Sequence, residues 1–359
     1  GGRGMESAYD PSHLRTFMAE ATRISPDHPV YLDRFLEGAI ECDVDALCDG
    51  EQVYVGGVLE HIEEAGIHSG DSATCIPPFS FSDRLVGELR DITRRLALRL
   101  GVRGLINVQY AIKGETIYVI EANPRASRTV PFVSKSTGVP LAKCAALIMG
   151  GRSIESLNLP ADDRRMDYFC VKEAVMPWGR FPGANVVLGP EMKSTGEVMG
   201  IASTYPEAYA KTQLAVSYEL PKEGTVFISV CDRDKRHILP IARTIQRLGF
   251  RIVSTEGTAR TLRGGNVRCE VVRKISEPHP NIGDMISNGE IALIVNTPYG
   301  SETRGDGYFM RTEAVKHGVT CVTALSGASA FTAALEALDE NPYGLPVVAL
   351  QDLPQHEVK

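Results

Sequence analysis

The sequence predicts an α/β and α+β protein in which two architectures follow each other along one chain. Residues up to about 217 combine a β-hairpin, a long helix and further mixed strands, which is typical of an α+β fold. From residue 225 onward, five apolar runs alternate with helical patterns, which predicts a doubly wound parallel sheet. Between these parts, Pro221 to Gly224 has the composition of a linker.

The bulk composition indicates a globular protein of two or three domains. The chain has 359 residues, of which 43% are hydrophobic, so it can bury a sizeable core. Its apolar runs are far shorter than the roughly 20 residues that cross a bilayer, and residues 1–10 lack the pattern of a signal peptide. We therefore expect a cytoplasmic protein with no membrane partner. The net charge of -7 comes from mixed signs, which does not favour a nucleic-acid partner.

The cysteines do not indicate a disulfide framework or a zinc site. Eight are scattered along the chain without a C-x-x-C pair, mostly beside apolar residues. This pattern predicts buried, reduced thiols.

The first part of the chain is predicted element by element. Residues 30–50 indicate a strand, a turn and a second strand in which apolar residues alternate with acids, and residues 52–63 indicate a further strand. Residues 82–100 repeat apolar positions at helical spacing, with Ser82 placed to cap the helix and Gly101 to end it. Residues 138–150 predict a short apolar helix, and another helix begins at Pro206.

Two β-rich runs, residues 104–112 and 116–123, predict a hairpin. We expect a three-residue loop over 113–115, because it places four polar side chains on one face: Asn107, Gln109, Glu121 and Asn123. A two-residue loop would separate Gln109 from Glu121.

The second part predicts five strands that alternate with helices. The strands are expected at 225–230, 250–255, 269–275, 291–296 and 319–323, and the longer helices at 235–248, 281–288, 308–317 and 328–338. In such a sheet, ligands bind at the carboxyl ends of the strands.

The stretch "YVIEANPRASRTVPF" predicts a hard-cation site. Glu121 and Asn123 are two apart on a strand and so point the same way, and a paired Gln109 would add a third oxygen ligand. Such ligands suit Mg²⁺ or Mn²⁺. Arg125 and Arg128 follow, and both could bind an anionic substrate or a phosphoryl group. The alternative is a surface carboxylate paired with an arginine, but the crowding of polar residues after one strand favours the site.

Other polar stretches are less specific. The glycines at 1–4 could cover phosphates or could be a disordered end. His68 and Ser69 lie in a loop that could face a ligand or solvent. In the second part, hydroxyl, lysine and asparagine side chains follow successive strands, which predicts an anion pocket, although helix capping explains some of them.

Four stretches resemble the large subunit of carbamoyl-phosphate synthase: "NVQYAI", "IEANPRASRTVPFVSKSTGVPLAK", "HIEEAGIHSGDSA" and "LGPEMKSTGEVMG". The resemblance spans essentially the whole chain and corresponds to the carboxyl-terminal part of that subunit. It implies an incomplete ATP-grasp module followed by a domain similar to methylglyoxal synthase. The implied segments are the ATP-grasp module at 1–150, the remainder of the synthetic unit at 151–217 and an allosteric domain at 218–359.

The resemblance implies ATP-dependent phosphorylation of carbamate to carbamoyl phosphate, a precursor for arginine and pyrimidine biosynthesis. The implied cofactors are ATP, Mg²⁺ or Mn²⁺, and also K⁺. The implied partners are a carbamate substrate derived from bicarbonate, a glutaminase small subunit, a nucleoside monophosphate effector, and further copies in an oligomer.

The resemblance also assigns roles to individual residues. Gln109, Glu121 and Asn123 would hold the metal, and Arg125 and Arg128, together with Asn123, would act on carbamate and the transferred phosphoryl group. The remaining nucleotide contacts would be Arg34, Leu36, Glu41, Gly66, Ile67, His68 and Ser69. The effector site would comprise Lys235, Thr255, Thr258, Lys274 and Asn296.

The chain departs from this family pattern in three ways. Pro298 stands where some relatives carry a hydroxyl group. Four residues match an ornithine site found in some relatives, namely Glu63, Asp71, Glu173 and Thr323, but Cys321 replaces the expected aromatic residue, which argues against ornithine activation. The early part of the ATP-grasp module is missing, so we expect the isolated fragment to turn over poorly.

This truncation supports an alternative function, in which the chain is a regulatory fragment that binds a nucleoside monophosphate and has no catalytic activity of its own. A ligase similar to biotin carboxylase fits less well, because that class does not account for the arginine motif or the last part of the chain.

Overall fold

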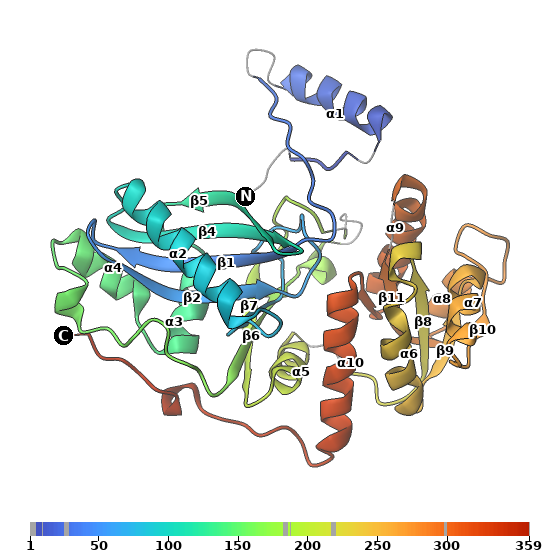
Figure 1. Cartoon of the computed structure of the whole chain (residues 1–359). Helices are drawn as coiled ribbons and strands as arrows, with labels where there is room; N and C mark the ends of the chain where they lie inside the picture. Colours follow the sequence, from blue (N-terminus) through green and yellow to red (C-terminus); the bar gives the residue numbers. More distant parts are fainter. Residues whose placement is uncertain are drawn as a thin grey trace.

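The computed structural model describes residues 5–8, 10–24, 29–181, 186, 188–216, 220–297 and 300–358. The glycine-rich stretch at 1–4 and Pro298 lie outside these residues. Figure 1 shows a first unit, residues 5–216, and a second unit, residues 220–340, each built on one β-sheet. Within the described residues, no helix is long and apolar enough to span a membrane. The cysteines are free, and five of them are buried, as predicted.

The first unit is built on an antiparallel sheet in the strand order β5-β4-β1-β2-β3-β6-β7. Its strands are β1 (Ile40–Cys48), β2 (Val53–His61), β3 (Thr74–Ile76), β4 (Gly104–Lys113), β5 (Thr116–Asn123), β6 (Phe169–Val175) and β7 (Gly196–Ala202). Strands from both sides of residue 150 therefore share one layer, and the predicted domain boundary at this residue stays a prediction.

Helices cover both faces of this sheet. They are α2 (Asp83–Arg99), α3 (Val130–Thr137), α4 (Leu141–Met149) and α5 (Tyr205–Ala215), whereas α1 (Pro11–Ile24) stands apart from the sheet (Figure 1). Helix α2 packs on the face that carries Val44 and Val108, whereas α3 and α4 pack with Leu47 on the opposite face. The predicted ends of α2 are confirmed, because the Ser82 hydroxyl accepts a hydrogen bond from Leu85 N and Gly101 follows with φ +63°.

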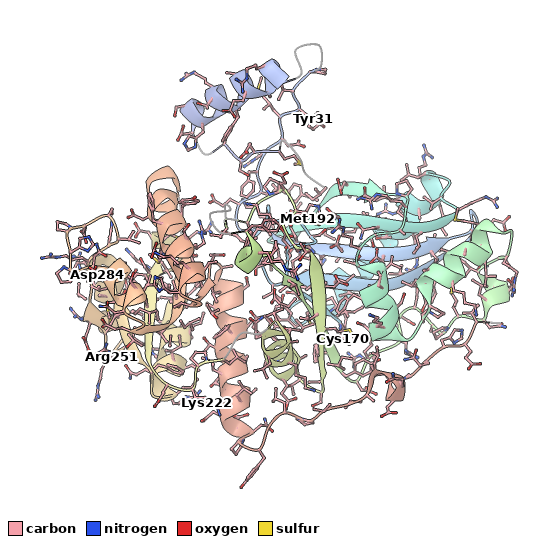
Figure 2. All side chains as sticks on the ribbon, turned by 180° about the vertical axis from the view of Figure 1, so that it is seen from behind. Tyr31, Cys170, Met192, Lys222, Arg251 and Asp284 are labelled. Atoms are coloured by element: carbon pink, nitrogen blue, oxygen red, sulfur yellow. The ribbon has the colours of Figure 1, made fainter. Side chains whose placement is uncertain are left out.

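Some element predictions are wrong. No strand forms within residues 30–36, because this segment pairs with no other strand of the described chain. Tyr31 there is 87% exposed, and Figure 2 shows it on an arm that stands apart from both sheets. Helix α3 is absent from the predicted elements, since its sequence is short and rich in β-branched residues.

The β4–β5 hairpin forms as predicted, but its loop is shorter than predicted. Lys113 pairs with Thr116, so the loop contains only residues 114–115. A β-bulge then shifts the register, and Gln109 lies directly opposite Glu121 while Asn107 lies opposite Asn123. The expectation that these four side chains share one face is confirmed, because the bulge compensates for the shorter loop.

The second unit contains the predicted doubly wound parallel sheet, in the order β10-β9-β8-β11-β12. Its elements are β8 (Thr225–Val230), α6 (Ile238–Arg247), β9 (Arg251–Ser254), α7 (Glu256–Gly264), β10 (Glu270–Val271), α8 (Ile282–Ser287), β11 (Ile291–Thr297), α9 (Gly300–Lys316), β12 (Thr320–Val322) and α10 (Leu325–Glu340). Strand β10 is much shorter than predicted, and α9 begins earlier than residue 308.

The two units share a hydrophobic core. Helix α10 packs against α5, so that Phe331 of the second unit and Tyr209 of the first belong to one buried cluster. Arg233 adds a polar contact between the units, with its Nη1 3.2 Å from Glu37 Oε1. The predicted linker, which includes Lys222, lies at this junction (Figure 2).

After α10, residues 341–358 return to the first unit, and we call them the C-terminal strap (Figure 1). Val358 is only 4% exposed and packs in the core formed with α3 and α4. The His356 N–H donates to the Gly138 carbonyl at 2.8 Å. Gly138 has φ +72°, and a Cβ atom on it would lie 1.8 Å from the Pro354 oxygen. The strap thus fits closely against the end of α3.

Candidate functional site

Two rows of polar side chains cross the central strands of the first sheet. Strands β1 and β4 pair Asp43 with Gln109 and Asp45 with Asn107, and strands β4 and β5 continue these rows to Glu121 and Asn123. Directly opposed residues of neighbouring strands point to the same face. The sheet therefore presents carboxylates and amides together, beside the end of β5.

The predicted metal ligands direct their amide nitrogens to other protein groups. Gln109 Nε2 donates to Ser69 Oγ at 3.1 Å, and Asn123 Nδ2 donates to Glu121 Oε1 at 2.7 Å. Each amide nitrogen already has an acceptor, so the carbonyl oxygen is the metal-binding atom of each amide. The Asn123 oxygen also accepts from Arg125 Nη2 at 3.5 Å, a long contact that a bound ion would replace. Two amide oxygens and a carboxylate suit Mg²⁺ or Mn²⁺. The residues present fit such an ion.

The segment after β5, residues 124–129, carries both predicted arginines, and we call it the arginine loop. Arg125 and Arg128 are exposed, and Arg125 Nη1 donates to the carbonyl of Ala126 at 3.2 Å. By contrast, Thr129 is buried at the start of α3. The loop therefore combines a fixed end with two guanidinium groups that remain accessible to a ligand.

The predicted nucleotide contacts lie together only in part. Leu36 packs against a small cluster with Ala39 and Ala65, while Glu41 Oε1 accepts from Gly66 N at 3.0 Å. Burial raises the pKa of Glu41. Gly66 has φ +91°, and the Phe35 ring would be 2.6 Å from a Cβ atom on it. Arg34, in contrast, is exposed on the segment where the predicted strand is absent.

The loop that contains Ile67, His68 and Ser69 joins this region to the metal ligands. The Ser69 hydroxyl accepts from Gln109, and its carbonyl accepts from Lys172 Nζ at 3.0 Å. The N–H of His68 donates to the Gly189 carbonyl at 2.8 Å, and burial lowers the pKa of its ring. This loop is ordered by contacts from three directions.

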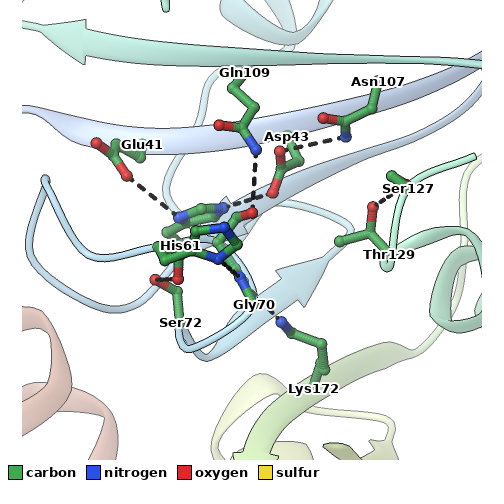
Figure 3. A network of polar contacts seen from close by, with 12 residues as sticks. Glu41, Asp43, His61, Gly70, Ser72, Asn107, Gln109, Ser127, Thr129 and Lys172 are labelled. Carbon is green, nitrogen blue, oxygen red and sulfur yellow. Dashed lines mark hydrogen bonds and ion pairs between the residues drawn. The ribbon is translucent and has the colours of Figure 1, made fainter. Parts of the chain in front are cut away.

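Figure 3 shows a buried network that was not predicted from sequence, centred on His61 of β2. His61 Nε2 lies 2.9 Å from Asp43 Oδ2, and its Nδ1 lies 3.8 Å from Glu41 Oε2. Burial alone would raise the pKa of Asp43, but the contacts with His61, together with Lys172 and Asn107, lower the pKa below its ordinary value. Burial also lowers the pKa of Lys172. The alternation of acids along β1 was the available signal, since it places Glu41, Asp43 and Asp45 on one face.

The predicted effector residues gather at the carboxyl end of β8, with one exception. Thr255 Oγ1 lies 3.0 Å from Ser229 Oγ, Asn296 Nδ2 donates to the Ser229 carbonyl at 3.0 Å, and Thr258 Oγ1 accepts from Val230 N at 3.2 Å. Lys235 approaches from the following turn and pairs with Asp232. Lys274 is exposed, and its described contact is with Glu277.

A cavity of about 610 Å³ lies between the two units. All five residues compared with an ornithine site line it: Glu63, Asp71, Glu173, Cys321 and Thr323. Burial raises the pKa of Glu63 to about 8 and that of Glu173 to about 7. Gln213 Nε2 donates to Glu173 at 2.7 Å. The cavity therefore contains two carboxyl groups, Glu63 and Glu173, whose ionisation is disfavoured.

Two family models match the chain, one for each unit. The carbamoyl-phosphate synthase L chain ATP-binding domain matches residues 1–157, and the MGS-like domain matches residues 237–323. The two matches assign the first unit to an ATP-binding domain family and the second unit to the MGS-like family.

Relatives make the assignment more specific. The chain is 47% identical to the carbamoyl phosphate synthase large chain, C-terminal section, of Aquifex aeolicus, over 98% of this chain and 69% of that relative. It is 53% identical to the large chain of Methanothermobacter thermautotrophicus, over 94% of this chain but 32% of that relative. The chain belongs to the carbamoyl phosphate synthase large-chain family. It spans about a third of the length of the full-length relatives it matches.

Among solved structures, the biotin carboxylase domain of the Hydrogenobacter thermophilus 2-oxoglutarate carboxylase is 16% identical, with a TM-score of 0.48, over 60% of this chain and 54% of that one. At this TM-score the likeness decides nothing about function.

Proposed function

We propose that this chain is the carboxyl-terminal part of a carbamoyl phosphate synthase large chain and phosphorylates carbamate with ATP and a divalent metal ion. The observation that carries the proposal is that oxygen donors for a cation and guanidinium groups for an anion lie together at one edge of the sheet. Glu121, Gln109 and Asn123 offer oxygen atoms to a cation, and the arginine loop begins at the next residue. A site for phosphoryl transfer needs these two charge-neutralising elements side by side.

The proposed roles follow from the position of each group. Gln109, Glu121 and Asn123 would hold Mg²⁺ or Mn²⁺, which neutralises phosphate charge when bound. Leu36, Glu41 and the 66–69 loop would bind the nucleoside, and Arg125 and Arg128 would hold carbamate and the phosphoryl group as it moves. Catalysis would then come from positioning and charge stabilisation without a covalent intermediate. A K⁺ ion is a further proposed cofactor.

Mg·ATP binding tests this proposal. We expect isothermal titration calorimetry to detect binding to the wild-type chain, and Glu121→Ala to weaken it by more than about tenfold, because a metal ligand is lost. Glu115→Ala is the matched control, since Glu115 lies in the same hairpin but its side chain is 91% exposed. Equal binding by the Glu121 and Glu115 variants would contradict the proposed metal site.

We further propose that the second unit binds a nucleoside monophosphate near Lys235, Thr255, Thr258 and Asn296, with Lys274 at its margin. Asn296 Oδ1 supports this, because it is buried and has no hydrogen-bond partner among the described residues, so it can accept from a ligand hydroxyl or N–H. Titration with UMP and IMP tests the site. A chain that binds either nucleotide but not Mg·ATP would instead be the regulatory fragment described above.

The remaining assignments concern the intact protein. We propose that it is cytoplasmic, that it forms oligomers, and that a glutaminase small subunit supplies its nitrogen. Copurification of a glutaminase with the full-length protein would support the last assignment. Activity with free ammonia but none with glutamine would oppose it.

A further inference from the structure

Asp45 is a fully buried carboxylate behind the arginine loop. It is 0% exposed on β1, and three neutral groups donate to it. Ser127 Oγ lies 2.7 Å from Oδ1, Thr129 Oγ1 lies 2.5 Å from Oδ2, and Asn107 Nδ2 lies 3.0 Å from Oδ1. The Ser127 and Thr129 hydroxyl oxygens are also 2.8 Å apart. Each hydroxyl has one proton, and both protons are directed to the same carboxylate.

The geometry of this network fixes one particular residue of the loop. Ser127 and Thr129 flank Arg128 in the sequence, so the backbone of Arg128 is anchored on both sides by one carboxylate. Asn107 connects the same carboxylate to the row that ends in Asn123. Asp45 therefore links the metal-binding side of the site to its arginine side.

Helix stability does not explain these contacts. Thr129 occupies the N-cap position of α3, yet its side chain makes no capping hydrogen bond. An N-cap threonine ordinarily stabilises its helix by bonding to the first free N–H groups. Here the hydroxyl is directed to Asp45 instead.

The burial of this carboxylate is itself unfavourable for the fold. A buried carboxylate without a cationic partner loses its hydration, and burial raises the pKa of Asp45 to about 6. An apolar residue would avoid this cost but could not hold two hydroxyl groups. The presence of a carboxylate is thus explained by what it positions.

We propose that Asp45 is a positioning residue for Arg128: it holds Ser127 and Thr129 so that the Arg128 guanidinium is presented to the phosphoryl group of the substrate. This inference rests on the proposed function for the identity of the ligand. The anchoring of the loop itself is independent of that function.

Hydrogen exchange measures the anchoring directly. We expect the backbone amides of residues 125–130 to exchange at least about tenfold faster in Asp45→Ala than in the wild-type chain, because the network is lost. Asp45→Asn should be intermediate, since an amide can accept from one hydroxyl and donate to the other. Should the alanine variant fail to fold, Asp45→Asn still provides the test.

Glu60→Gln is the matched control. Glu60 is likewise buried on a neighbouring strand and accepts from a serine hydroxyl and from two backbone N–H groups, but those donors are Phe79 and Ser80, outside the arginine loop. We expect exchange at 125–130 to be unchanged in this variant.

Ligand affinity completes the experiment. We expect Asp45→Ala to weaken binding of carbamoyl phosphate about tenfold, whereas Mg·ADP binding changes by less than about twofold. Unchanged exchange at 125–130, or equal loss of both ligands in a folded variant, would overturn the inference. A wild-type chain that binds neither ligand would refute the proposed function instead, and hydrogen exchange alone would then decide whether Asp45 anchors the loop.

Discussion

Glu63 and Glu173 face the same cavity between the units, and burial there disfavours the ionised form of both carboxyl groups. Burial is the main reason that the pKa of each group is raised, and the charge of Glu173 further disfavours ionisation of Glu63. In the unfolded chain, both carboxyl groups would lose their protons at a pH near 4.5, the ordinary pKa of glutamate. Between that pH and about 8, the folded protein binds more protons than the unfolded protein does.

This difference predicts that the free energy of unfolding decreases as the pH rises from about 4.5 to about 8. Glu63→Gln should flatten this decrease and should stabilise the protein at pH 8 by at least about 1 kcal/mol, with little effect at pH 5. Urea unfolding across this pH range is the measurement. The exposed Glu51→Gln serves as the control, and parallel pH profiles for wild type and Glu63→Gln would contradict the prediction.

Residues were predicted from sequence where their spacing along one strand was sufficient. Glu121 and Asn123 lie two apart, so their common direction needed no tertiary information. Their shared face with Gln109 and Asn107 was predicted from the hairpin, but in the structure it also depends on the bulge. His61, Lys172 and Asp45 could not be assigned in this way. Their partners come from other strands and from the arginine loop, so their roles depend on sheet order and register.

At the scale of elements, the shared face of the β4–β5 hairpin was predicted correctly from an incorrect loop. Alternation of side chains determines which residues can share a face. A bulge adds one residue to one strand and so reverses the face on which the following residues lie. Nothing in the local sequence marked the bulge at Ile120. The strand predicted within 30–36 failed for a related reason, because β propensity is realised only where a neighbouring strand supplies hydrogen bonds.

Strand β7 and helix α5 approach closely at Gly200. A Cβ atom on this glycine would lie 2.1 Å from the Ala208 carbonyl oxygen. Gly200→Ala should therefore destabilise the protein by about 2–3 kcal/mol, because the helix must move away from the strand. Gly196→Ala, on the same strand, is the control, since its Cβ atom would meet only Val175 at 3.9 Å. Denaturant unfolding of both variants checks the prediction, which equal stabilities would contradict.

At the scale of the whole molecule, the C-terminal strap depends on Gly138. We expect Gly138→Ala to release the strap, because a methyl group there would collide with the Pro354 carbonyl. Loss of Val358 burial should add about 2 kcal/mol to the strain of an alanine at positive φ, itself about 1–2 kcal/mol. Hydrogen exchange of the His356 amide and thermal unfolding are the measurements.

Gly101→Ala isolates the strain from the loss of the strap. Gly101 also follows a helix with positive φ, but a Cβ atom on it would have no neighbouring atom within 4 Å. If both alanine variants lose the same stability, and the His356 amide stays protected in Gly138→Ala, the strap does not contribute as described.

The two architectures were predictable because each has its own periodicity, and the linker was predictable from its composition. The shared core and the strap were not. Phe331 and Tyr209 are apolar positions on separate helices, and sequence does not show that these helices pack together. The strap has no regular sequence pattern and only one short 3-10 helix, Leu350–Asp352, so only the structure shows that Val358 is buried in the first unit.

The strap also bears on the order in which this chain folds during synthesis. Gly138 and His356 are brought together across the entire second unit, and contacts of such large sequence separation form late because a long loop must close first. On the ribosome, the core around α3 and α4 would remain without Val358 until the second unit had been translated. The first unit would thus emerge from the ribosome first but would be completed last.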